Sequence, residues 1–171
     1  RFVGLTRFPI YFFCDEAVQS TLADGLIHNG FRSSDGVLFP PFLRNDQRFN
    51  LSLSVYAQVV PVALFGMSVF VTRATSVVLG GLVIVGVVVV LRVLGVRAWW
   101  ISPFVLASLP LWFLHSRTAF EVVLMVAAYA CFLGAYLLYR CRSARWAPVA
   151  ILCGAATFYS YANGQGLMAL T

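Results

Sequence analysis

The sequence has little charge and no lysine at all. Charged residues make up 11% of the 171 residues, all twelve basic residues are arginine, and only six residues are acidic. Apolar residues make up 61%, which is more than the interior of a soluble domain of this length can hide. Lipid must therefore solvate part of the surface. The arginines are scattered without a basic run, so the net charge of +6 does not indicate a nucleic-acid partner.

The sequence also lacks the motifs that bind nucleotides or structural metals. It contains no glycine-rich phosphate loop, no dinucleotide fingerprint and no Ser-His-Asp order. Its four cysteines include no Cys-x-x-Cys pair, and three of them lie in or beside apolar stretches, where a thiol behaves as a small apolar side chain. The cysteines therefore indicate packing rather than a disulfide or a metal site.

Long apolar stretches dominate the last two thirds of the chain. Charge is absent from residues 74–91, 98–114, 122–139 and 146–171. A helix of about twenty apolar residues is long enough to cross a bilayer. We therefore predict an all-α, polytopic transmembrane helical bundle. Its membrane helices are expected within residues 73–171, at about 74–96, 98–115, 121–139 and 146–163.

The first 50 residues are more polar. Residues 1–50 contain five of the six acidic residues and several Gly and Pro, which predicts a structured loop outside the membrane. Within it, residues 16–27 predict a short helix with Asp15 as its N-cap. The chain opens on Arg1 and stops inside an apolar stretch, so we expect an internal piece of a longer protein, truncated at both ends.

Residues 51–72 contain no charged residue, yet polar residues recur along one side of the helix that they would form. Asn50, Ser54, Gln58 and Pro61 recur at helical spacing. A helix with one wet face tends to lie along the bilayer surface rather than to cross it. We predict a juxtamembrane amphipathic helix over 51–72, with a membrane span as the alternative.

The arginines indicate an orientation. Arg92 and Arg97 flank one link between predicted spans, and Arg140, Arg142 and Arg145 lie in the link two spans later. Both links therefore face the same side, which the positive-inside rule makes cytoplasmic. If residues 51–72 do not cross, all six acidic residues lie at the extracytoplasmic face of an inner (plasma) membrane.

An acidic pair, Asp15-Glu16, directly follows an apolar run at 8–13. Carboxylates placed where a chain leaves the membrane can hold a divalent cation or accept a proton from a hydroxyl. The alternative is that Asp15 only caps the helix that follows.

A second set of polar residues precedes the span at 121–139. Arg117 offers a planar fork that suits phosphate oxygens, and Glu121 opens the span at a helix N-terminus, where the helix dipole stabilises a carboxylate. An Arg117–Glu121 ion pair one turn apart is the alternative. Arg44 and Arg48 could similarly bind a lipid phosphate or could belong to a solvated face.

Four short stretches occur in a characteristic order and spacing: FFCDEA at 12–17, NLSLSVY at 50–56, LFGMSVFVTR at 64–73 and HSRTAFE at 115–121. Together they resemble the GT-C class of membrane glycosyltransferases. The closest likeness is to the bacterial glycosyltransferase family 39 proteins, relatives of protein O-mannosyltransferases and lipid A aminoarabinose transferases. On this pattern Asp15 matches the catalytic acidic position and Glu16 is its partner. Glu121 matches a second acidic position, which is Asp in many relatives.

The resemblance implies an inverting transfer of a sugar from a polyprenyl-phosphate donor in the bilayer to an acceptor hydroxyl on a protein, lipid or glycan. Asp15 would take the proton from that hydroxyl. Arg117, or a divalent cation held by Asp15 and Glu121, would stabilise the departing phosphate. The alternative function is a transporter or flippase for a lipid-linked or small polar substrate, which predicts ionisable residues near mid-span and interrupted helices.

Overall fold

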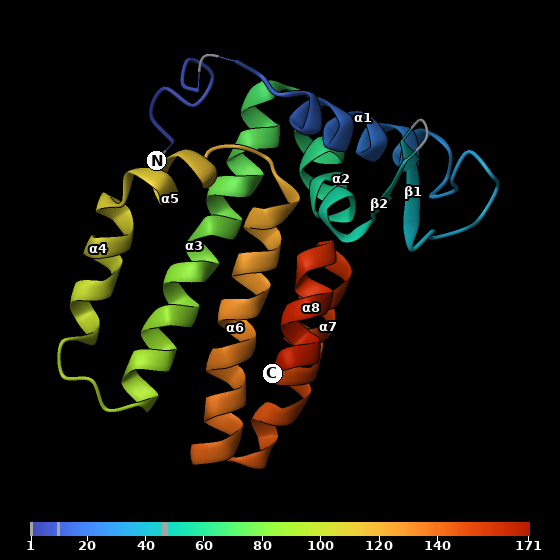
Figure 1. The fold of residues 1–171 in the computed structure, drawn as a ribbon. Helices are drawn as coiled ribbons and strands as arrows, with labels where there is room; N and C mark the ends of the chain where they lie inside the picture. Colours follow the sequence, from blue (N-terminus) through green and yellow to red (C-terminus); the bar gives the residue numbers. More distant parts are fainter. Residues whose placement is uncertain (1, 10, 46–47) are drawn as a thin grey trace.

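The computed structural model describes residues 2–9, 11–45 and 48–171, and most of them are helical (Figure 1). The helices are α1 (Cys14–His28), α2 (Leu53–Phe65), α3 (Val69–Val93), α4 (Ser102–Ser108), α5 (Pro110–His115), α6 (Glu121–Cys141), α7 (Ala147–Ser160) and α8 (Ala162–Leu170), with the 3-10 turns η1 (Trp99–Ile101) and η2 (Ala144–Trp146). The predicted mostly helical class is confirmed. The described residues also include a short antiparallel pair that was not predicted, formed by β1 (Phe42–Asn45) and β2 (Arg48–Leu51).

Two helices, α3 and α6, are long and apolar enough to cross a membrane. They contain 25 and 21 residues. At 1.5 Å per residue they extend about 38 Å and about 32 Å, against a hydrocarbon layer of about 30 Å. They correspond to the spans predicted at 74–96 and 121–139, although α3 begins earlier, at Val69.

α3 and α6 lie side by side and approach closely at glycines (Figure 1). A Cβ atom built on Gly86 would lie 2.5 Å from the carbonyl carbon of Ala130, and one on Gly134 would lie 3.2 Å from a methyl group of Val89. Small residues allow helix backbones to approach in this way, which is how helices commonly associate in lipid.

The stretch predicted as a span at 98–115 is not one helix. It is divided into η1, α4 and α5, and the break falls at Leu109, whose ψ of 115° is extended. Pro110 explains the break, because proline disfavours helical backbone at the preceding residue and has no N–H to donate.

The last apolar stretch, predicted as a span at 146–163, forms a hairpin of two short helices. α7 ends at Ser160, Tyr161 is extended, and α8 returns along α7 (Figure 1). Gly164 lies against the carbonyl of Thr157 at this turn. The 14 residues of α7 extend only about 21 Å, less than the hydrocarbon thickness.

α1, α2 and the strand pair cover the end of the bundle where α3 and α6 begin (Figure 1). α1 confirms the predicted helix at 16–27. Its N-cap, however, is Phe13 rather than Asp15, which lies inside the first turn. α1 and α2 are held together by one apolar cluster formed by Ala23, Leu26, Leu43, Val55, Val59, Val62 and Val71.

The polar stripe of α2 faces the protein and not water, so the predicted wet face is wrong. Ser54 and Gln58 are buried, and the Gln58 side-chain amide donates a hydrogen bond to the carbonyl of Thr72 at 3.1 Å. The opposite face is apolar and exposed, with Val60 62% and Leu64 70% accessible. Buried polar groups need hydrogen-bond partners, and α3 provides one of them here.

Candidate functional site

Two parts of the chain that are distant in the sequence meet where α3 and α6 begin (Figure 1). One comprises residues 2–9 and 11–13 with the first turn of α1 that follows them, and the other is the link 116–120 between α5 and α6. The rings of Phe13 and Phe120 pack together, with centroids 5.5 Å apart. Residues predicted to share one face of the membrane are therefore brought to one end of the bundle.

Arg73 connects these segments. Its side chain is 1% exposed and forms a two-pronged ion pair with Glu16, from Nε to Oε1 and from Nη2 to Oε2, each at 3.1 Å. The remaining N–H groups donate to the backbone carbonyls of Leu5, Pro9 and Tyr11 at 2.8–2.9 Å. All five donors of the guanidinium are thus used.

Glu16 is fully buried, and both of its carboxylate oxygens are occupied. Besides Arg73, Oε2 accepts from the backbone N–H of Phe13 at 3.1 Å, and Oε1 accepts from that of Ala119 at 3.0 Å. The first bond is the capping contact expected for a Glu at the third helical position. In this geometry Glu16 positions the surrounding backbone and has no oxygen left for a substrate.

Arg117 performs a similar task. It is 3% exposed and donates to the carbonyls of Phe8 and Val3, at 2.9 and 3.0 Å from Nη2. Burial, and secondarily the charge of Arg73, lowers the pKa of Arg117 below its usual value. The Arg117–Glu121 ion pair stays an alternative for these two residues. These hydrogen bonds go to protein carbonyls, and the phosphate-binding role of Arg117 stays a prediction.

Asp15 and Glu121 are the two carboxylates that approach one another at this end. Asp15 is exposed in the first turn of α1, and Glu121 is half-buried at the first position of α6. Residues next to them are in contact, because the backbone N–H of Ala119 donates to Glu16 Oε1 and the rings of Phe13 and Phe120 pack together. Within the described part of the chain, the Asp15 carboxylate has no hydrogen-bond or ion-pair partner. The capping role considered for Asp15 is thereby excluded, and the group faces outward.

The other predicted ligands lie elsewhere or are not described. Arg44, on β1, borders a hollow formed with the second half of α1, around Gly25 and Asn29, away from Asp15. The side chain of Arg48 falls outside the described residues. Among the residues that the structure describes, no group of three or more His, Cys, Asp or Glu side chains converges, so a metal would have only Asp15 and Glu121 here.

Sequence reasoning missed Arg73, which is the centre of this arrangement. The signal was available, because Arg73 is the one charged residue in the 43 positions between Arg48 and Arg92. An ionisable residue within an apolar run usually has a specific partner.

Comparison of the chain with protein-family models, with curated proteins and with solved structures finds no match. The resemblance to GT-C glycosyltransferases, which rests on its four stretches, therefore stays a prediction.

Proposed function

We propose that this protein is a membrane glycosyltransferase that moves a sugar from a polyprenyl-phosphate donor to an acceptor hydroxyl. The observation that carries the proposal is the exposed carboxylate of Asp15, which has no hydrogen-bond or ion-pair partner in the described part of the chain and lies at the same end of the bundle as Glu121. Both groups lie at the start of apolar helices or next to them, where a lipid-linked donor and a water-borne acceptor could meet.

Asp15 acts as the general base in this reaction. It accepts the proton of the acceptor hydroxyl as that oxygen attacks the anomeric carbon from the side opposite the phosphate. A new carbon–oxygen bond forms, the bond to the polyprenyl phosphate breaks, and the phosphate leaves with the electron pair. The configuration at the anomeric carbon is inverted. Phosphate is a competent leaving group, so neutralising its charge is the other main requirement.

A divalent cation fits the donor set, because Mg²⁺ is commonly held by one or two carboxylates together with substrate phosphates. Asp15 and Glu121 would hold it, and it would supply charge neutralisation at the departing phosphate. Arg73, Glu16 and Arg117 act differently. They hold residues 3–9 and the link before α6 in place, and thereby the spacing of Asp15 and Glu121.

In this proposal the protein crosses an inner (plasma) membrane several times, with the site at the extracytoplasmic face. α3 and α6 supply two crossings. The last turns of α3 and α6 and the links that follow them lie at the opposite end of the bundle (Figure 1). They carry five arginines, which the positive-inside rule places in the cytoplasm.

The proposal is tested with membranes that contain the full-length protein. Radiolabelled polyprenyl-phosphate hexose or pentose is expected to yield a covalently labelled acceptor, whereas the corresponding nucleotide sugars are not. Membranes without the protein serve as the control. Equal labelling from nucleotide sugars would contradict the donor class. Movement of the lipid-linked sugar across the bilayer without a new glycosidic bond would replace the proposal with the flippase alternative.

A further inference from the structure

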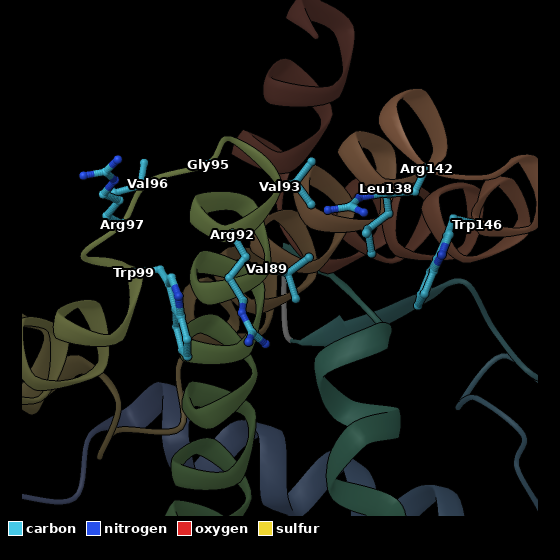
Figure 2. A pocket seen from close by; sticks show the side chains of 10 residues that line it. All are labelled: Val89, Arg92, Val93, Gly95, Val96, Arg97, Trp99, Leu138, Arg142 and Trp146. Atoms are coloured by element: carbon cyan, nitrogen blue, oxygen red, sulfur yellow. The ribbon is translucent and has the colours of Figure 1, made fainter.

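A hollow opens at the end of the bundle opposite Asp15 and Glu121, where α3 leads into η1 and α6 leads into η2 (Figure 2). Its volume is about 780 Å³. Three arginines and two tryptophans line it together with apolar side chains, and the five are Arg92, Arg97, Arg142, Trp99 and Trp146. The proposed sugar transfer makes no use of this hollow.

The positive charge of the hollow is not balanced by the protein. The sequence contains no acidic residue in 47–120 or in 122–171. Within the described residues, none of Arg92, Arg97 and Arg142 forms an ion pair, and all three are exposed. A cluster of guanidinium groups at one point of the surface is complementary to an anionic ligand.

Two of the three arginines line the hollow from different elements. In Figure 2, Arg142 extends from the end of α6 toward Val93 of α3, and Arg92 extends from α3 beside Trp99. Arg97 points away from both. Arg92 and Arg142 thus reach the hollow from opposite helices.

Trp99 holds Arg92 in place. The guanidinium carbon of Arg92 lies 4.1 Å from the centroid of the Trp99 ring, which is a cation–π contact. A guanidinium that stacks by its face keeps the N–H groups at its edge for a planar, two-pronged contact to phosphate oxygens. Stacking also reduces the freedom that the side chain would lose on binding.

The remaining walls of the hollow are apolar and could accommodate the hydrocarbon chain of a lipid. Val89, Val93, Val96 and Leu138 contribute apolar surface directly beside the arginines. Tryptophan is enriched at the level of lipid headgroups, where one side of the ring is apolar and the other wet. A ligand that satisfies both parts of the hollow has a negatively charged head and an acyl tail.

We propose that this hollow binds an anionic phospholipid of the cytoplasmic leaflet. Arg92 and Arg142 donate hydrogen bonds to the phosphate, and the acyl chains lie along the wall formed by α3 and α6. Basic pockets between helices on the cytoplasmic side are suited to such headgroups. The inference depends on insertion of α3 and α6 in a bilayer, and it does not depend on glycosyl transfer.

The test uses the full-length protein in a neutral detergent, titrated with phosphatidylglycerol or phosphatidylcholine, with bound lipid counted by native mass spectrometry. We expect tighter binding of phosphatidylglycerol. Arg92→Gln with Arg142→Gln should weaken it by about thirtyfold, because each basic residue near an anionic headgroup contributes roughly fivefold in affinity. Phosphatidylcholine binding should not change.

Arg140→Gln is the matched control, because Arg140 lies at the same end of α6, carries the same charge and does not line the hollow. This variant should keep its preference for phosphatidylglycerol. Equal binding of the two lipids by the unmodified protein would overturn the proposal, as would a loss in Arg140→Gln as large as in the double variant. Displacement of phosphatidylglycerol by millimolar inorganic phosphate would also overturn it, since the hollow would then recognise free phosphate.

Discussion

Replacing Asp15 by Asn should lower the rate of sugar transfer by about 10²–10⁴-fold, the contribution typical of a general base. The amide has the size of the carboxylate but cannot accept the proton of the acceptor hydroxyl at neutral pH. Folding should be unaffected, because Asp15 is exposed and has no hydrogen-bond or ion-pair partner in the described part of the chain. The measurement is transfer of labelled sugar from the polyprenyl-phosphate donor, at equal amounts of protein in the membrane.

Asp24→Asn provides the control on the same helix. Asp24 also lies on α1, with its carboxylate 3.5 Å from the ring of the exposed His28, and the substitution removes the same charge. Its transfer rate should match that of the unmodified protein. Undiminished transfer by Asp15→Asn would remove Asp15 from the role of base. An equal loss in both variants would point to the charge of α1 as a whole.

Arg73→Met should destabilise the protein by about 3–5 kcal/mol, the cost typical of breaking a buried ion pair by removing one partner. The Glu16 carboxylate would stay in a fully buried place without its counter-charge, and the carbonyls of Leu5, Pro9 and Tyr11 would lose their donor. Thermal unfolding in detergent should shift down accordingly. Segment 2–13 should also become accessible to protease well below the unfolding temperature.

Two comparisons separate this effect from a general loss of charge. Arg7→Met removes an exposed arginine and should leave the unfolding temperature nearly unchanged. Adding Glu16→Gln to Arg73→Met should recover part of the loss, because the uncompensated buried charge is then gone. Equal unfolding temperatures for Arg73→Met and Arg7→Met would contradict the central position of Arg73.

Composition and apolar runs predicted the helical class and the two longest helices. A long helix that is buried or surrounded by lipid needs apolar side chains at many consecutive positions, so its sequence identifies it. The helix beginning near Asp15 was predicted for the same reason. Its cap was not, because Glu16 and the backbone of Phe13 provide it and Asp15 takes no part. The exact residue at which a helix begins or ends depends on single contacts, and the pattern of apolar and polar residues does not specify these contacts.

The spans predicted at 98–115 and 146–163 failed as continuous helices for a related reason. The absence of charged residues indicates that a segment tolerates an apolar environment. It does not indicate that the segment forms one continuous helix. Pro110 and the extended Tyr161 divide these stretches.

Partners across the chain were the least predictable part of the site. A polar stripe on α2 has the same sequence pattern whether it faces water or another helix. The packing of α3, where the carbonyl of Thr72 accepts a hydrogen bond from Gln58, determines that it faces the protein. Likewise, Arg73 finds Glu16 at a separation of 57 residues. The sequence could mark Asp15, Glu16 and Glu121 as acidic residues of one face, but it could not show that Glu16 is turned inward while Asp15 is turned outward.

The central claim is that Asp15 and Glu121 border one site on the extracytoplasmic face, opposite the arginine-bearing links. Single-cysteine variants of the full-length protein test it in intact cells with a membrane-impermeant maleimide. One keeps Cys14, one carries Glu121→Cys, and one keeps Cys141 at the end of α6. Cys14 and Cys141 are both exposed, so access depends on the side of the membrane. Labelling of the first two variants from outside, with Cys141 labelled only after permeabilisation, is the predicted result. Labelling of Cys14 and of Glu121→Cys from opposite sides would contradict the account.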